Sequence, residues 1–437
     1  MNQTRSRLLH VVALTTAFAM SVTATLAWAR TGGTDVVDIP VESPVPVVAS
    51  PTASPAPTTI PPSPSPSPSR TAALRLPTAT VPPGPTATPP KPTYRPLPAA
   101  TDEGTDRLLH RPRPLESTTQ APEQCTVGSQ LVPTCGILWG VAPGARTERR
   151  GVRALAEFER KTGRHQAIFH GYHRGIRQMF PTEQEITIAR EPGRKRILLL
   201  NWKPETTTWA KIAKGDRRTD EFLDRLAVHL KENFREPFFF AVHHEAEDQV
   251  RERPGSGYTA RDYAAMFRHV VKRLRAKGAT NVVTVLVHMA YVPHTTKSWF
   301  RHMYPGDDVV DWIGFDTYSY SDPGYGHGDF AELLNRRSAS KPGWPGFYNW
   351  VSRRHPSKPL MIAEWGVWFS KRNPDHMAEF YREVGKQIAD FPGIKAMVHF
   401  ETPANHKRQD SRVDSTPAAL REYRRLGRLP VFQVSLG

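Results

Sequence analysis

Cysteine is nearly absent from this chain of 437 residues, which contains only Cys125 and Cys135. A structural metal site would need more ligands of the same kind nearby, and the sequence does not supply them. In an exported protein, two cysteines this close together predict a disulfide that closes a short loop. We therefore expect Cys125 and Cys135 to staple the start of the globular region, and we expect the chemistry to use neither a metal nor a cofactor.

Several functional motifs are also missing. The sequence has no glycine-rich dinucleotide fingerprint, no phosphate-binding P-loop and no G-x-S-x-G nucleophile elbow. The net charge is +17, but the basic residues are dispersed and accompany no nucleic-acid reading motif. We expect no nucleic-acid partner, and interpret the charge as a solvated surface. Attraction to anionic cell-wall polymers is an expected by-product of that charge.

Long apolar runs are limited to one, between Leu8 and Trp28, which follows Arg5 and Arg7. This pattern predicts a secretory signal peptide over residues 1–29, with an uncleaved membrane anchor as the alternative. Aromatic residues are scarce in residues 30–121, which consist mainly of proline, threonine, serine and alanine. Such a segment cannot bury enough apolar surface to offset its ordering entropy. We predict a disordered, Pro-rich linker there, serving as a stalk for a secreted or cell-envelope protein.

Residues 122–437 have a globular composition in which apolar, β-rich runs alternate with helical patterns. This alternation predicts parallel strand pairing, and eight repeats favour a (β/α)8 TIM barrel, of the α/β class, in a monomer. A doubly wound open sheet is the alternative. The predicted strands are Gly136–Val141, Gln166–Tyr172, Arg196–Trp202, Pro237–His244, Val282–Ala290, Val309–Tyr318, Pro359–Trp365 and Lys395–Glu401; the predicted helices are Thr147–Lys161, Asp220–Phe234, Thr259–Lys277, Asp375–Ala389 and Pro417–Leu426.

Two glutamates stand where apolar strands stop. Glu245 closes the fourth predicted strand, and Glu364 lies at the end of the seventh. Barrel enzymes carry their sites at the carboxyl ends of the strands, so the two side chains are expected to converge over the barrel mouth. Other polar and aromatic residues at strand ends suit a sugar, which stacks on rings and hydrogen-bonds through hydroxyls. The candidate substrate-binding residues are His244, Trp202, Asn201, Tyr291, Asp316, Tyr318, Trp365 and Trp139.

Metal catalysis by His243 and His244 is a weaker interpretation. A zincin needs a second histidine four residues after His244, where this chain has Asp248. Neighbouring side chains on a strand point to opposite faces, so we expect His243 to pack in the outer layer. Glu247 and Asp248 compete with Glu245 for the catalytic role, but they lie further into the loop.

The chain resembles glycoside hydrolase family 26, a family of retaining (β/α)8 enzymes that includes the β-mannanases. The resemblance is carried by Leu200-Asn201-Trp202, His244-Glu245, Tyr304-Pro305-Gly306-Asp307, Val310–Tyr318 and Ala363-Glu364-Trp365-Gly366. It implies that Glu245 is the acid/base, that Glu364 is the nucleophile, and that His244 flanks the acid/base. It also implies that Asp316 and Tyr318 line a sugar subsite. Family mannanases normally have Arg-Pro-Leu before the His-Glu pair, where this chain has Phe240-Ala241-Val242.

The expected reaction is a double displacement on a β-linked polysaccharide, most simply β-1,4-mannan, with β-glucan or xylan as alternatives. Retention of configuration requires the two carboxyl groups to lie ~5–5.5 Å apart. Tyr291 or Tyr318 is expected to hold Glu364 in its ionised form. Two non-enzymatic classes stay open: a carbohydrate-binding barrel without turnover, and a wall-associated adhesion protein.

Overall fold

The computed structural model describes residues 125–147, 151–323, 328–405 and 407–436. The expected signal peptide at 1–29 and the expected linker at 30–121 lie outside these ranges. Among the helices of the described ranges, none is both long and apolar enough to cross a membrane.

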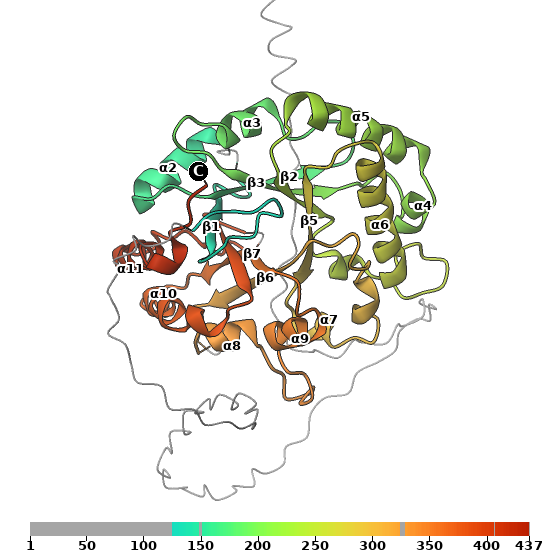
Figure 1. Ribbon diagram of the computed structural model, residues 1–437. Coiled ribbons are helices and arrows are strands. Elements are labelled where there is room, and N and C mark those ends of the chain that lie inside the picture. The colour runs from blue at the N-terminus through green and yellow to red at the C-terminus, as the bar shows by residue number, and fades with distance from the viewer. Residues whose placement is uncertain (1–124, 148–150, 324–327, 406, 437) are drawn as a thin grey trace, which may run out of the picture. The chain divides into compact units, whose positions relative to one another are not determined.

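Eight parallel strands form a closed barrel in which each strand pairs with its neighbours in the sequence and β1 pairs with β8. Figure 1 shows this ring of strands with helices arranged around it. The predicted (β/α)8 fold is therefore confirmed, and every predicted strand is present. The strands are β1 Leu138–Ala142, β2 Ile168–Arg174, β3 Ile197–Lys203, β4 Phe238–Val242, β5 Val282–Met289, β6 Trp312–Tyr320, β7 Leu360–Trp368 and β8 Ile394–Phe400.

The long helices also follow the sequence prediction, whereas several short ones do not. The pattern over Thr147–Lys161 becomes α2, which begins only at Val152. Helices of four to eight residues contain too few turns for an apolar period to be recognised. The helices are α2 Val152–Thr162, α3 Glu183–Ala189, α4 Trp209–Ala213, α5 Arg217–Asn233, α6 Ala260–Ala276, α7 Val292–Thr295, α8 Phe330–Leu334, α9 Phe347–Arg354, α10 His376–Gln387 and α11 Pro417–Gly427, with 3-10 turns at Ala246–Gln249, Phe300–Met303, Ile388–Asp390 and Pro430–Phe432.

Helix starts are fixed by side chains that satisfy free backbone N–H groups. Thr259 and Asp262 form a reciprocal capping box at the start of α6, and Asp216 accepts from the backbone N–H of Thr219 in α5. Thr416 caps α11, whose first residue is Pro417. Each such cap contributes about 1 kcal/mol, so these residues define where the helices begin.

Strand alternation divides the barrel's apolar side chains into two layers. Inside the barrel lie residues such as Leu199, Phe239 and Val285. Between the barrel and the helices lie their sequence neighbours, such as Leu200 and Phe240. Because both faces of every strand are covered, the strands are near-continuous apolar runs, and polar side chains concentrate at the strand ends.

The amino ends of the strands are closed by the two ends of the described chain. Cys125 and Cys135 form the expected disulfide, and the loop between them packs Leu131 against the lower barrel core. The indole of Trp312 donates to the carbonyl of Gln130 (2.8 Å), and the N–H of Ser435 donates to the carbonyl of Cys125 (3.0 Å). The opposite end, where the strands terminate, carries the polar residues.

Candidate active site

A β-bulge in β7 aims Glu364 into the barrel. In the pairing with β6, Phe315 faces Ile362 and Asp316 faces Glu364, so Ala363 is an extra residue. Ile362 packs outside the barrel and Ala363 inside, and Trp365 is again outside. Strict alternation would turn Glu364 toward the helices, but the extra residue lets it face inward with Ala363. Bulges often re-aim side chains in this way next to active sites.

The backbone turns sharply after β4, so the side chains of consecutive residues there point in different directions. His243 and Glu245 both have left-handed backbone conformations, with φ of 50° and 51°. His243 packs outward, where its Nδ1 accepts a hydrogen bond from the indole of Trp209 (3.0 Å), as expected for a structural histidine. His244 points toward Glu364, with 3.8 Å between its Nε2 and Oε1 of the glutamate. Non-glycine residues with positive φ are strained and cluster at functional sites.

Two tyrosines hold Glu364. The hydroxyl of Tyr172, from β2, donates to Oε1 (2.7 Å), and the hydroxyl of Tyr318, from β6, donates to Oε2 (2.6 Å). Glu364 is only 1% exposed. Tyr318 was expected to hold Glu364 in its ionised form, and its hydroxyl does donate to this carboxyl, while Tyr172 was missing from the predicted site. Its position at the end of the second predicted strand was the signal that could have identified it.

The two glutamates differ in their electrostatic environment. Burial raises the pKa of Glu364 to about 7, although the tyrosine hydrogen bonds and the charge of Arg146 act to lower it. Burial also raises the pKa of Glu245 well above its usual value, and the negative charges of Glu364, Asp248 and Glu247 add to that rise. The hydrogen bonds to Glu364 thus favour its ionised form, whereas the charges around Glu245 favour its protonated form. Opposing influences of this kind suit one acid and one nucleophile.

Asp316 and His244 complete the polar group around Glu364. Burial and the charge of Glu364 raise the pKa of Asp316 well above its usual value. Burial lowers the pKa of His244 well below its usual value, so the imidazole is neutral. Ligand atoms of His244, Asp316 and Glu364 all lie within 4.8 Å of one another, so these three side chains form a group that could hold a metal ion.

Asn201 and Tyr291 lie at the same end of the barrel. Asn201 is buried on β3 between Tyr172 of β2 and Ala241 of β4 in the strand register, and it therefore faces the interior. Tyr291 follows β5 by two residues and is half-buried, with its ring centroid 5.2 Å from that of His294. Both positions agree with their prediction as residues near the barrel mouth.

The three predicted tryptophans do not face the site, and this expectation is corrected. Trp139, Trp202 and Trp365 are each 0% exposed and belong to the outer core between strands and helices. Trp202 stacks on Phe222 (5.4 Å), and Trp139 and Trp365 pack on each other (5.6 Å). The prediction treated strand-end position as sufficient, whereas side-chain alternation decides which residues face the interior.

Other aromatic residues lie at the carboxyl end of the barrel. Trp368 stacks on Tyr318, with 4.8 Å between ring centroids, and both belong to one cluster with Tyr320, Phe400 and the partly buried Tyr172. Trp368 and Tyr320 were missed because β6 and β7 extend two and three residues beyond their predicted ends.

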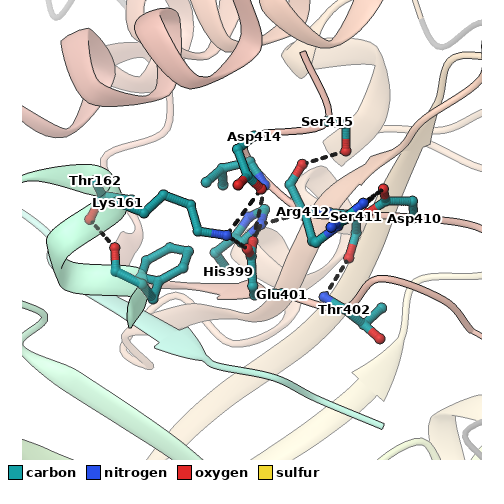
Figure 2. A network of polar contacts seen from close by, with 12 residues as sticks. Lys161, Thr162, His399, Glu401, Thr402, Asp410, Ser411, Arg412, Asp414 and Ser415 are labelled. Carbon is teal, nitrogen blue, oxygen red and sulfur yellow. Dashed lines mark hydrogen bonds and ion pairs between the residues drawn. The ribbon is translucent and has the colours of Figure 1, made fainter. Parts of the chain in front are cut away.

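The remaining carboxylates at this end have structural partners. Glu247 bonds to His288 (2.6 Å) and Asp248 to His294 (2.8 Å), which leaves Glu245 as the carboxylate at the end of β4 without such a histidine. Glu401, just after β8, pairs with Lys161 (2.7 Å) and accepts from the backbone N–H of Val413 (3.0 Å). Figure 2 shows Glu401 within this network, which ties the loop after β8 to α2.

A (β/α)8 barrel with two differently tuned glutamates at the ends of β4 and β7 has the architecture of a glycosidase. The model of glycosyl hydrolase family 26 matches residues 210–338 of the sequence. This part of the chain is therefore similar to a family of glycosidases.

Curated relatives match only part of the chain. Endoglucanase H of Acetivibrio thermocellus is 29% identical over 241 residues, which are 52% of this chain and 24% of that protein. Beta-1,3-xylanase TXYA of a Vibrio species is 32% identical over 69 residues, which are 16% of this chain and 15% of that protein. The chain therefore covers about a quarter or less of the length of these two relatives.

Solved structures similar to the chain include the GH26 β-mannanase BoMan26A from Bacteroides ovatus. It is 17% identical, with a TM-score of 0.49, and the match covers 69% of this chain and 91% of that one. A modular endo-β-1,4-mannanase from Cellulomonas fimi is also 17% identical, with a TM-score of 0.47, and the match covers 69% of this chain and 73% of that one.

Proposed function

We propose that this protein hydrolyses a β-linked polysaccharide with net retention, using Glu364 as nucleophile and Glu245 as acid/base. The observation that supports this most is that the two carboxyl groups have different hydrogen-bond partners and neighbouring charges. Glu364 accepts two tyrosine hydrogen bonds, which favour its ionised form, whereas Glu245 lies among negative charges that favour its protonated form.

In the first step, a carboxylate oxygen of Glu364 attacks the anomeric carbon, and Glu245 gives its proton to the departing glycosidic oxygen. The products are a glycosyl ester on Glu364 and a shortened sugar chain. In the second step, Glu245 takes a proton from water, and the hydroxide attacks the anomeric carbon and releases Glu364. His244 and Asp316 are positioned beside Glu364 to hydrogen-bond sugar hydroxyls.

For the substrate we propose a β-linked polymer of neutral sugars, with β-1,4-mannan as the first choice. The alternatives remain a β-glucan and a xylan, and two relatives of the chain are named as an endoglucanase and a beta-1,3-xylanase. Phe240-Ala241-Val242 before the His-Glu pair departs from the usual mannanase segment. All three polymers therefore belong in the first activity screen.

The protein, Glu364→Ala and Glu245→Ala should be assayed on mannan, mixed-linkage glucan and β-1,3-xylan. Both variants should lose at least about 10³-fold of the rate on the polymer that the wild type cleaves. Azide should rescue both, and the stereochemistry should separate their roles: Glu364→Ala gives a glycosyl azide of inverted configuration, and Glu245→Ala one of retained configuration. Full activity in Glu364→Ala would remove it as nucleophile.

Two controls sharpen this assay. Glu157→Gln changes an exposed carboxylate on α2, away from both glutamates, so it should retain most of the activity. EDTA should leave the rate unchanged, because the two glutamates supply the chemistry without a cation. A loss of activity in EDTA that zinc or calcium restores would instead assign His244, Asp316 and Glu364 to a metal site.

A carbohydrate-binding barrel without turnover is the competing class. It predicts that the wild type and Glu364→Ala bind the same polysaccharide and that neither releases reducing ends. We further propose, from the sequence of residues 1–121, that the protein is exported and works at the cell envelope. Fractionation of the source cells followed by immunoblotting would test that location.

A further inference from the structure

Two adjoining cavities lie on the outer side of the barrel, and the residues that they share stand before β2. Their volumes are about 540 and 440 Å³, and both are lined by Gly163, Arg164 and His165. The first lies between α2 and α3, and the second extends along the end of α11 to Ser435. Residues 163–165 precede β2, so the shared part of this groove lies at the amino ends of the strands. Figure 1 shows α2 and α11 side by side, with the end of the chain beside them.

Positive charge dominates the lining of this groove. Its carboxylates are Glu159 and Glu191, and both are engaged by Arg196, whose guanidinium lies 3.0 Å from Glu159 and 2.5 Å from Glu191. Arg196 is itself buried, and its single positive charge offsets one of the two negative charges. The other arginines of the two cavities are Arg160, Arg164, Arg194, Arg424 and Arg428.

Arg164, which both cavities share, has no carboxylate partner in the part of the chain that the structure describes. Its guanidinium donates to the carbonyls of Gly427 and Phe432 and lies 5.8 Å from the ring of Trp139. Burial lowers the pKa of Arg164 to about 10, because removing the charged guanidinium from water is unfavourable. A nearby anion would stabilise the charged form.

Some of these cations offset the negative ends of helices. Arg164 binds the last carbonyl of α11, and Arg424 donates to the carbonyl of Lys161 in α2. That role does not account for Arg160 and Arg428, whose guanidinium groups make no hydrogen bond or ion pair with any described residue. Arg194 is 58% exposed, and its nearest carboxylate oxygens are 3.8 and 3.9 Å away.

The first cavity also has an apolar wall, made by Val152, Leu155, Ala156 and Ile188. An apolar wall beside arginines suits a polyol or sugar unit, whose C–H groups pack on the wall while its acidic group pairs with guanidinium. We propose that this groove binds a linear polyanion made of sugar or polyol units that carry phosphate or carboxylate groups.

Binding there would leave the glutamates free, because the lining of the groove contains none of the residues around Glu364 and Glu245. The protein could remain attached to an anionic polymer while it acts on a neutral one. The inference does not depend on the proposed hydrolysis, since binding can be measured whether or not the protein has activity.

The test compares two triple variants that lose the same charge. Arg160, Arg194 and Arg428 are changed to Gln in the groove variant. Arg217, Lys231 and Lys272, which are exposed on α5 and α6, are changed to Gln in the control variant. Binding to poly(glycerol phosphate), polygalacturonate and neutral dextran is measured by co-sedimentation or calorimetry at two salt concentrations.

The groove variant should bind the polyanions at least about tenfold more weakly than the wild type, with a shallower dependence on salt. The control variant should remain within about twofold of the wild type. Binding of only one polyanion would identify phosphate or carboxylate as the recognised group. Equal weakening in both variants, no weakening in the groove variant, or equally tight binding of dextran would overturn the proposal. Thermal unfolding curves of both variants verify that they are folded.

Discussion

At the scale of single residues, the ionised carboxyl of Glu364 lowers the stability of the folded protein. Its pKa is raised from 4.5 to about 7, so the unfolded chain releases this proton at lower pH than the folded protein does. Stability is therefore lost as pH rises from about 4.5 to 7 and stays lost above that, by an amount on the order of 3 kcal/mol.

Glu364→Gln should accordingly stabilise the protein at pH 8 and change its stability little at pH 4. The measurement is the free energy of unfolding from denaturant titrations at both pH values, with Glu157→Gln on the exposed side of α2 as the control. An equal effect of Glu364→Gln at the two pH values would show that titration of this group is not the cause.

The tyrosines that hold Glu364 give a second prediction. Tyr318→Phe removes a hydrogen bond that lowers the pKa of Glu364, so that pKa should rise further. The acidic limb of the pH profile of kcat/KM should then move to higher pH, because the nucleophile must be ionised. The rate at the optimum should fall roughly 10–100-fold, as expected for a hydrogen bond to a charged group of about 1.5–3 kcal/mol.

Tyr172→Phe should shift the profile in the same direction, since its hydroxyl donates to the other oxygen of Glu364. Tyr320→Phe serves as the comparison, because Tyr320 belongs to the same aromatic cluster. A lower rate in the Glu364-contacting variants with an unchanged pH profile would mean that the tyrosines position the glutamate without tuning its proton affinity.

At the scale of elements, the network around Glu401 connects α2 with the loop after β8 (Figure 2). Burial by itself would lower the pKa of Lys161, but the charges and hydrogen bonds of Glu401 and Asp414 outweigh it and raise that pKa. The resulting stability is fully present below pH 10.5 and is lost as pH rises through the folded-state pKa of Lys161.

Lys161→Met should destabilise the protein by about 3 kcal/mol at pH 7, because Glu401 would remain buried without its cation. The double variant Lys161→Met, Glu401→Gln should recover part of this loss. Denaturant unfolding of the single and double variants measures the coupling. Additive effects of the two substitutions would contradict the proposed ion pair.

The strand pattern of the sequence predicted which elements exist, because buried parallel strands are near-continuous apolar runs separated by amphipathic helices. It could not predict the bulge at Ala363 or the left-handed residues at the end of β4, since both depend on pairing between strands. These two features decide that Glu364 and His244 face the interior while Trp365 and His243 face outward. The glutamates could thus be selected from the sequence, but their aromatic neighbours could not.

At the scale of the whole molecule, the disulfide loop and the last residues of the chain close the lower end of the barrel. Cys125 and Cys135 are 10 positions apart in the sequence, so the lost chain entropy of the unfolded state predicts a stabilisation of roughly 2–3 kcal/mol from the disulfide. Cys125→Ser, Cys135→Ser should lower the free energy of unfolding by up to that amount. The catalytic rate should be unchanged, because the loop lies at the opposite end from the glutamates.

Unfolding of the double serine variant and of the wild type under reducing conditions should give the same midpoint. A fall in catalytic rate without loss of folded protein would show that the two ends of the barrel are coupled.

Buried polar atoms near Glu364 that lack hydrogen-bonding partners in the described part of the chain also offer a way to find the natural ligand. Within the described residues, Nε2 of His244 and Oε2 of Glu245 have no hydrogen-bonding partner. A ligand whose hydroxyl groups supply those partners would raise the melting temperature of the protein. Glycan libraries could therefore be screened by differential scanning fluorimetry with the Glu364→Gln variant, which would hold its ligand without consuming it.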